Sequence, residues 1–323
     1  MLCSARCQAS RIVSQLTFFP PNPAFYKFTA DGDLPLGGEE ESEVEMANPA
    51  AVTRSQTHPA YKISLDASLI CPSIISMICS CDITTLRVPV QSPSRWFGCI
   101  QGDVHGVATV VLNKKEDQPP QTRKKTIIYS HGNAADIGMM FDRFLHLALL
   151  LDVQVVAYDY SGYGESEGTC GEIQAYRDIE GVYEYVRNTL NVNDEDIIIY
   201  GQSVGSGPSC YLAEKYDLGG LVLHSPFLSG LRVLTEDRCL SCFDPFQNIS
   251  RISSVNCKVF IIHGAADKEV HFRHGVGLQE KVREECKTEP WFVVGRGHND
   301  IVDNERQLQE YIRRLKAFLL LCS

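Results

Sequence analysis

The residues whose types and spacing could do chemistry begin with the motif Gly201-Gln202-Ser203-Val204-Gly205. It follows an apolar run typical of a β-strand and precedes a helical pattern. A serine in this setting sits on a sharp strand-to-helix turn, where the two glycines leave room for the neighbouring strand and helix. We therefore predict that Ser203 is a nucleophile. The simpler alternative is a serine that caps the following helix.

A serine nucleophile needs a histidine to take its proton and a carboxylate to orient that histidine. In strand-turn-helix hydrolases the three occur in the chain order serine, acid, histidine. Asp267 follows one predicted strand and His298 follows the next, so the order is met. Alone, Asp267 would be interpreted as a helix cap and His298 as an ordinary loop histidine. Asp237 and Asp244 are alternative acids after the preceding strand.

Acyl transfer at a serine also needs fixed N–H groups that stabilise a tetrahedral oxyanion. The loop His131-Gly132-Asn133-Ala134 follows an earlier predicted strand, from which a loop amide can point at the nucleophile. We expect the backbone amides of Asn133 and Ala134, together with that of Val204, to form this oxyanion hole. A tight strand-to-helix turn explains the same loop, and both interpretations can hold.

Other polar residues are better explained by structure than by catalysis. Asp159 follows a strand but precedes Ser203 in the chain, so we expect it to brace the Gly-rich loop after it. His271 and His274 could pair as metal ligands, but no carboxylate has a matching spacing, and a solvated helix start is the simpler interpretation. The predicted chemistry needs no cofactor and no metal.

The elements that must position these residues appear from about residue 96. Short, nearly continuous apolar runs predict strands at 106–112, 126–130, 153–158, 196–200, 219–224, 258–263 and 290–294. Between them lie helical patterns at 138–151, 172–190, 207–216, 274–286 and 301–320. This alternation predicts an α/β fold, with a mostly parallel central sheet and helices on both faces. Ligands of such sheets bind at the carboxyl ends of the strands.

The chain before residue 96 is harder to interpret. Residues 1–30 form an irregular, mildly basic N-terminal segment, and the acidic, Gly-rich stretch 31–45 predicts a linker. The apolar run 68–81 could be a core helix, a membrane-surface segment or an irregular insertion. The expected organisation is therefore an N-terminal segment (1–30), a linker and insertion (31–95) and one α/β domain (96–323).

Composition excludes several classes of protein. A net charge of -10 argues against nucleic acid as a partner, because phosphate binding needs a concentrated basic surface. The 13 cysteines lack regular spacing, which argues against a disulfide framework and favours a reducing compartment. No apolar run reaches the roughly 18 residues that would span a bilayer, and the N-terminus lacks the features of a secretory signal.

Several motifs in order resemble one known family. "SHGNAADIG", "YDYSGYGESEG", "IIIYGQSVG", "IIHGAADKEV" and "GRGHNDI" together look like the α/β-hydrolase domain-containing protein 17 family, over about residues 96–320. The resemblance recurs at 11–23. It implies an α/β-hydrolase fold and a membrane-associated serine hydrolase that removes palmitate from cysteines. It also implies Ser203 as nucleophile, Asp267 as acid and His298 as base, in agreement with the residues above.

The resemblance further implies a membrane anchor at the N-terminus. The family carries a palmitoylated cysteine cluster there, and in this sequence Cys3 and Cys7 stand in its place. Two acyl chains suffice for stable anchoring whereas one does not. The apolar side chains nearby would then lie in the membrane interface; they are Ile12, Val13, Leu16, Phe18 and Phe19. Alternatively, they pack onto the hydrolase body as an ordinary arm.

The expected function is cleavage of S-palmitoyl groups from membrane-associated proteins, at the cytoplasmic face of the plasma membrane or endosomes. A carboxylesterase or lipase acting on small-molecule or glyceride esters is the alternative within enzymes, because the triad does not fix the acyl chain. Specificity would then lie in the segment from Leu228 to Ile252, which includes Leu231, Leu234, Phe243 and Phe246. A non-catalytic, membrane-tethered binding protein is an alternative of another class.

Overall fold

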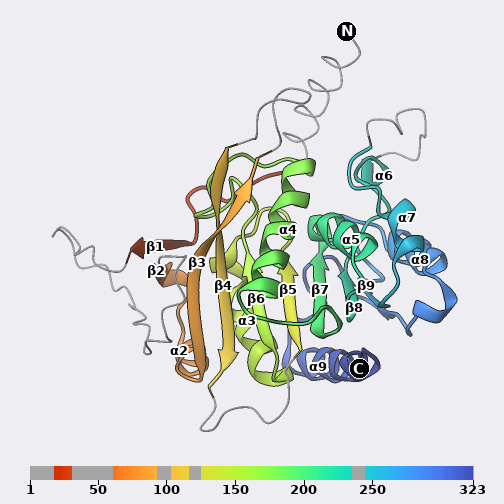
Figure 1. Ribbon diagram of the computed structural model, residues 1–323. Coiled ribbons are helices and arrows are strands. Elements are labelled where there is room, and N and C mark those ends of the chain that lie inside the picture. Colours follow the sequence, from red (N-terminus) through yellow and green to blue (C-terminus); the bar gives the residue numbers. More distant parts are fainter. Residues whose placement is uncertain (1–17, 31–60, 93–102, 116–124, 235–243, 323) are drawn as a thin grey trace.

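The computed structural model describes residues 18–30, 61–92, 103–115, 125–234 and 244–322 (Figure 1). Within these residues the strands form a ten-stranded sheet in the order β1-β2-β3-β4-β6-β5-β7-β8-β9-β10. The strands are β1 (Tyr26–Ala30), β2 (Tyr61–Leu65), β3 (Cys81–Gln91), β4 (Val104–Lys114), β5 (Thr126–Ser130), β6 (Gln154–Tyr158), β7 (Ile197–Gln202), β8 (Gly220–His224), β9 (Lys258–Gly264) and β10 (Trp291–Val293).

The sheet has a parallel part and an antiparallel part. Six neighbouring strands run parallel, in the order β6, β5, β7, β8, β9 and β10. The strands β1 to β4 pair antiparallel with their neighbours, and β4 joins the two parts by pairing antiparallel with β6. Every residue of β5 and of β8 is buried, as expected for parallel strands covered on both faces. Because the parallel strands share one direction, their carboxyl ends meet at one edge of the sheet.

Helices cover both faces of this sheet (Figure 1). They are α2 (Pro72–Cys79), α3 (Ile137–Leu151), α4 (Glu172–Asn188), α5 (Ser206–Lys215), α6 (Gly230–Leu234), α7 (Asn248–Arg251), α8 (Arg273–Lys281) and α9 (Glu305–Leu321). Side chains of α4, α5 and α8 join one buried apolar cluster, and those of α3 and α9 join another. Successive residues of β5 divide between the two, since Ile128 belongs to the first and Ile127 to the second. The predicted mostly parallel sheet with helices on both faces is confirmed.

Local signals explain where two helices begin. The Asp136 side chain accepts a hydrogen bond from the backbone N–H of Met139 and caps α3. Asn304 caps α9 in the same way through the N–H of Gln307. A free backbone N–H at a helix start is satisfied by such a side-chain oxygen. The cap at Asn304 places the start of α9 four residues after the predicted start at 301.

The sheet begins well before residue 96. The long strand β3 pairs with β4 along its whole length, from Cys81 opposite Lys114 to Gln91 opposite Val104. β2 and β1 extend the sheet beyond β3. The predicted boundary at residue 96 is therefore not an edge of the folded body, because three strands of the same sheet precede it.

The apolar run 68–81 contains a short surface helix. Pro72 stands in the first turn of α2, where a missing N–H is tolerated. No residue of α2 is fully buried, and Ile75 is 40% exposed. Ile74, Met77 and Ile78 are partly buried against the α3 side of the sheet. The core-helix alternative is therefore wrong, and the membrane-surface alternative stays a prediction.

The cysteines in the described ranges are all free thiols. Most of them are buried, and Cys71 and Cys79 at the two ends of α2 are exposed. Among the described helices, none combines the length and the apolar character needed to cross a bilayer.

Candidate active site

Ser203 lies on a strained turn at the end of β7. Its φ of 51° falls in the left-handed region, which non-glycine residues rarely adopt. A Cβ atom at Gly205 would lie 2.1 Å from the carbonyl oxygen of Ser130 on the neighbouring strand, and one at Gly201 would lie 2.5 Å from the Gly205 carbonyl oxygen. The two glycines thus permit the close approach of strand and helix that the motif predicts.

Three loops at the carboxyl edge bring Ser203, Asp267 and His298 together. The Nε2 atom of His298 lies 3.0 Å from Ser203 Oγ, and its Nδ1 atom lies 2.7 Å from Asp267 Oδ2. An ionised carboxylate only accepts hydrogen bonds, so Nδ1 carries the proton and Nε2 is left to accept from the serine hydroxyl. This arrangement can take a proton from Ser203 as its oxygen attacks an electrophile.

Asp267 is held ionised by its surroundings. Its Oδ1 atom accepts hydrogen bonds from the backbone N–H groups of Glu269 at 2.9 Å and Val270 at 2.8 Å. Burial alone would raise the pKa of Asp267, but hydrogen bonds from His263 and His298 outweigh it and hold the pKa well below its usual range. The carboxylate is therefore charged at neutral pH and available to orient His298.

The alternative acids lie elsewhere or outside the described residues. Asp244 Oδ1 accepts a hydrogen bond from the backbone N–H of Leu231 at 2.8 Å, which ties it to α6. Asp237 lies outside the described residues. Of the two candidate acids that the structure describes, only Asp267 contacts His298.

Asp159 braces the Gly-rich loop, as predicted. A Cβ atom at Gly164 would lie 1.9 Å from Asp159 Oδ2, so the loop runs directly against this carboxylate. The same oxygen accepts a hydrogen bond from the hydroxyl of Tyr26 at 2.5 Å, and Oδ1 accepts one from the N–H of Ile137 at 2.9 Å. Asp159 therefore joins β1, α3 and the loop after β6.

The two histidines near α8 do not form a metal site. His274 is buried, its Nδ1 accepts a hydrogen bond from the N–H of Leu228 at 3.2 Å, and burial lowers its pKa to about 4. The prediction of a solvated histidine is wrong for His274, whose ring packs inside the fold as a neutral acceptor. His271 is exposed. Across the described ranges, no group of three or more His, Cys, Asp and Glu side chains could hold a metal ion.

The loop after β5 lies beside the serine. A Cβ atom at Gly132 would be 3.7 Å from the Cβ of Ser203. The N–H of Ala134 donates to Asn133 Oδ1 at 3.0 Å, so this amide is engaged within the loop. That geometry counts against Ala134 as an oxyanion donor in this conformation. The role of the Asn133 and Val204 backbone amides stays a prediction.

The N-terminal arm packs beside this loop. Phe18 is 5% exposed, and its ring makes edge contacts with Tyr160 and Tyr163. The N–H of Phe19 donates to Asn133 Oδ1 and to the hydroxyl of Tyr163, both at 2.9 Å. Phe18 therefore packs onto the body, and its predicted place in a membrane interface is wrong.

The remaining N-terminal predictions are not described by the structure. Cys3 and Cys7, the predicted lipidation sites, lie outside the described residues, as do Ile12, Val13 and Leu16. The side chain of Phe19 is 54% exposed.

The predicted specificity segment is only partly described. Phe246 is fully buried and lies against the rings of Phe18 and Tyr176, so it belongs to the core. Leu231 is half-buried on α6. The side chain of Leu234 and the whole of Phe243 lie outside the described structure.

Sequence reasoning missed His263, which lies beside the acid. Its Nε2 atom is 3.3 Å from Asp267 Oδ2. The available signal was its place in "IIHGAAD", at the end of a strand and four residues before the predicted acid.

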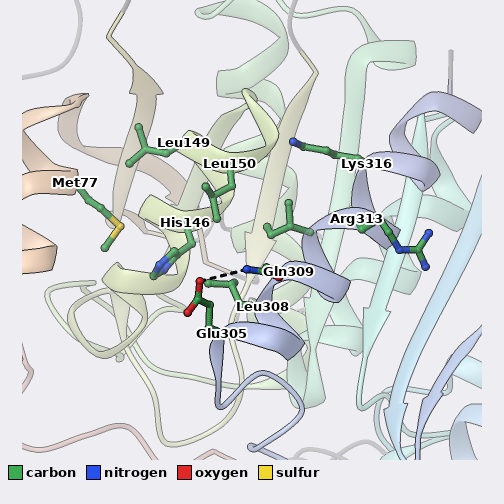
Figure 2. Close-up of a pocket in the computed structure, with 10 residues that line it drawn as sticks. Met77, His146, Leu149, Leu150, Glu305, Leu308, Gln309, Arg313 and Lys316 are labelled. Atoms are coloured by element: carbon green, nitrogen blue, oxygen red, sulfur yellow. Dashed lines mark hydrogen bonds between the residues drawn. The ribbon is translucent and has the colours of Figure 1, made fainter.

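A groove of about 640 Å³ lies between α2, α3 and α9 (Figure 2). Its lining combines apolar side chains with a polar and charged rim: Met77, Leu149, Leu150, Leu308, Ile312, His146, Glu305, Gln309, Arg313 and Lys316. No residue of the predicted site lines it, so the groove is separate from the candidate active site.

Comparison with known proteins identifies similar sequences. A family model described as serine aminopeptidase, S33 matches residues 121–236. The α/β-hydrolase domain-containing protein 17C of Xenopus laevis is 42% identical over 320 residues, which cover 99% of this chain and 92% of that protein. The α/β-hydrolase domain-containing protein 17B of Homo sapiens is 41% identical over 197 residues, which cover 61% of this chain and 66% of that protein.

Solved structures share the fold. An esterase of Pyrococcus furiosus has a TM-score of 0.56 at 16% identity, over 74% of this chain and 93% of that one. An acetyl xylan esterase from Paenibacillus sp. R4 has a TM-score of 0.58 at 13% identity, over 97% of this chain and 92% of that one. At these identities the likeness concerns the fold alone. The predicted α/β-hydrolase fold is confirmed.

Proposed function

This chain belongs to the α/β-hydrolase domain-containing protein 17 family, and we propose that it removes S-palmitoyl groups from proteins at membranes. Its membership supports a serine hydrolase of the α/β-hydrolase class. The choice of an acyl thioester as substrate is our proposal, and it rests on the motif resemblance across residues 96–320.

One observation carries the proposed mechanism. Ser203 Oγ, His298 and Asp267 form a continuous hydrogen-bonded chain, with separations of 3.0 Å and 2.7 Å. A serine that merely caps a helix needs neither partner. A protein that only binds its ligand also has no use for a hydroxyl aligned with an imidazole and a buried carboxylate.

The chemistry proceeds through an acyl-enzyme. Ser203 Oγ attacks the thioester carbonyl carbon while its proton passes to His298 Nε2, and Asp267 stabilises the resulting imidazolium. The backbone amides of Asn133 and Val204 stabilise the oxyanion. As the C–S bond breaks, the leaving cysteine sulfur takes the proton from His298. Water then gives a proton to His298 and attacks the Ser203 ester, and the fatty acid leaves as Ser203 regains its proton.

The proposed place of action is the cytoplasmic face of the plasma membrane or of endosomes. The substrates would be S-acylated membrane proteins, which a freely diffusing enzyme would meet rarely. Acylation of Cys3 and Cys7 would supply two chains, enough for stable anchoring. Arg6 and Arg11 add an electrostatic attraction to anionic lipid of about 1 kcal/mol each.

A fluorophosphonate probe tests the nucleophile. We expect the wild type to be labelled and Ser203→Ala to be unlabelled, because the probe reacts with an activated serine. Ser250→Ala is the matched control: Ser250 is exposed on α7, and its loss should leave labelling unchanged. Strong labelling that persists in Ser203→Ala would overturn the assignment.

A second measurement separates the acyl-thioesterase from the alternatives. We expect faster turnover of a long-chain peptide thioester than of a short-chain oxygen ester. The reverse preference would indicate a carboxylesterase or lipase. A protein that forms no acyl-enzyme with either substrate would be a binding protein on a hydrolase scaffold.

A further inference from the structure

Asp267 has a second imidazole beside it. His263, in β9, is fully buried, and its Nε2 atom lies 2.8 Å from the carbonyl oxygen of Val270. The same atom lies 3.3 Å from Asp267 Oδ2, the oxygen that also contacts His298. Two histidines therefore converge on one carboxylate oxygen, and the mechanism above uses only one of them.

The surroundings of His263 fix its protonation. The Val270 carbonyl can only accept a hydrogen bond, so Nε2 must carry a proton. Nδ1 is buried and has no hydrogen-bond partner among the described residues. It faces Gly275 of α8, where a Cβ atom would lie only 2.7 Å away. Because Nε2 bonds to the Val270 carbonyl and Nδ1 meets no partner among the described residues, the ring acts on its surroundings as a donor through Nε2.

The donors around Asp267 divide between its two oxygens. Oδ1 accepts from the N–H groups of Glu269 and Val270, and Oδ2 faces His298 and His263. The N–H of His263 is shared between Oδ2 and the Val270 carbonyl. It therefore ties the end of β9 to both ends of the turn that carries the acid. Loss of this donor would free Oδ2 to rotate and would leave its charge less dispersed.

We propose that His263 is a positioning residue that fixes the Asp267 carboxylate toward His298 and disperses the charge on the oxygen the two histidines share. This inference rests on the proposed function, because it assumes that Asp267 and His298 act on Ser203. His263 does not touch the reacting atoms. Its Nε2–H acts on the acid at Oδ2, the oxygen that also faces His298.

Other charged and titratable groups surround this site and stay constant between variants. His224 on β8 interacts electrostatically with Asp267, His263 and His298, and His274 on α8 interacts with His263. The charged and titratable groups that act on these two neighbouring histidines are Arg143 on α3, Arg232 on α6, Arg273 on α8 and His271 before α8. Glu269 lies in the turn that carries the acid. A change seen on altering His263 alone therefore reports the hydrogen bond of His263.

The test measures the rate of fluorophosphonate labelling of Ser203 across pH. In His263→Leu we expect labelling at the plateau to fall by about tenfold or more, because a misplaced catalytic group loses rate steeply. We also expect the acidic limb of the pH–rate profile, where labelling falls as His298 becomes protonated, to move to higher pH by about half a unit to one unit. The reason is that a carboxylate whose charge is less dispersed holds the protonated His298 more tightly. In His263→Gln, whose amide can replace the Nε2 donor, the limb should stay near the wild-type position.

A second variant covers the case in which His263→Leu does not fold. Gly275→Ala places a methyl group against Nδ1 and displaces the ring without removing it. We expect the same direction of shift in its acidic limb. A limb that stays at the wild-type position in both His263→Leu and Gly275→Ala, or moves to lower pH, would overturn the proposal.

The outcome separates this inference from the proposed function. If the wild type is not labelled at Ser203, the assigned nucleophile fails whatever His263 does. If the wild type is labelled at Ser203 and His263→Leu matches it in rate and pH profile, only the positioning role fails. If His263→Leu lost thermal stability but kept the acidic limb of the wild-type pH–rate profile, the role of His263 would be purely structural.

Discussion

The ring of Phe18 lies against the ring of Phe246, with centroids 5.9 Å apart and planes at 68°. Phe18 belongs to the N-terminal arm, and Phe246 belongs to the segment between β8 and α7. Two parts of the chain more than two hundred residues apart therefore share one core beside the candidate active site. The arm is an integral part of the folded body from Phe18 onward.

Replacing Phe18 should destabilise the protein. Removing a buried phenylalanine side chain typically costs about 3 kcal/mol or more, because apolar contacts are lost and a cavity remains. We expect Phe18→Ala to lower the free energy of unfolding by about this amount in urea titration. Phe19→Ala is the matched control and should change it by less than about 0.5 kcal/mol, since Phe19 is 54% exposed. Equal effects of the two substitutions would refute the packing of the arm.

The nucleophile turn should not tolerate a side chain at Gly205. A Cβ there would lie 2.1 Å from the carbonyl oxygen and 2.7 Å from the carbonyl carbon of Ser130. Both are backbone atoms of β5, so a change of side-chain rotamer cannot relieve the clash. Gly205→Ala should therefore destabilise the fold by about 3 kcal/mol and abolish probe labelling. Gly295→Ala is a useful control: apart from its two chain neighbours, no described residue has an atom within 4 Å of the added Cβ, so only its positive φ opposes it. A stable, fully labelled Gly205→Ala protein would contradict the described turn.

The identity of the acid can be tested with paired substitutions. Asp267→Asn removes the charge that orients and stabilises His298, and we expect turnover to fall by about 10⁴-fold, as for a misoriented triad histidine. Asp244→Asn removes the described alternative acid, which contacts Leu231 in α6, and should leave turnover within a few-fold of wild type. If steady-state kinetics instead showed the larger loss of turnover in Asp244→Asn, the catalytic acid would be Asp244, which follows the earlier strand β8.

Asp178 should make stability depend on pH. It is fully buried on α4 and accepts hydrogen bonds from the Ser161 hydroxyl at 2.7 Å, the Ser161 N–H at 2.8 Å and the Gln174 amide at 2.9 Å. Burial raises its pKa to about 6 despite these donors. The folded state thus binds this proton more tightly than the unfolded chain, whose value is about 4. The resulting stabilisation is complete below pH 4 and is lost as pH rises through 6.

The measurement compares wild type with Asp178→Asn at pH 5 and pH 7.5. Asparagine does not titrate, so the unfolding free energy of wild type relative to the variant should fall by about 1 kcal/mol across this interval. Asp82→Asn, at an exposed position of β3, serves as the control and should show no such trend. A difference that stays constant with pH would mean that the Asp178 carboxyl is not perturbed.

The strands and helices after residue 96 could be predicted because their signals are local. β5, β7 and β8 are short runs of apolar residues buried on both faces, and the Gly-X-Ser-X-Gly motif marks one strand end. β3 has no such continuous apolar run: buried positions alternate with less buried ones from Leu86 to Gln91, and the adjacent buried pair Thr85 and Leu86 breaks the alternation. Its pairing with β4 comes from tertiary contacts, so the sequence alone did not reveal it.

In the candidate site, too, the residues with local sequence signals could be predicted and those that depend on tertiary contacts could not. Ser203, Asp267 and His298 could be predicted because chain order and strand ends restrict where a triad can lie. The place of Phe18 depends on aromatic partners distant in sequence, and the role of His263 depends on where the Val270 carbonyl points. The polar residues around His274 predict a solvated helix start. In the structure, the backbone N–H of Leu228 donates to the buried ring of His274, a contact that the sequence does not indicate.

The central claim is that Ser203 carries the acyl group of a thioester during turnover. Wild-type protein and Ser203→Ala would be mixed with an S-palmitoyl peptide, quenched in acid at short times and digested for mass spectrometry. The account predicts a palmitoyl ester on the Ser203 peptide of the wild type, which decays as free palmitate appears, and no adduct and no palmitate release in Ser203→Ala. Palmitate release by Ser203→Ala, or an acyl group on any other residue in its place, would contradict it.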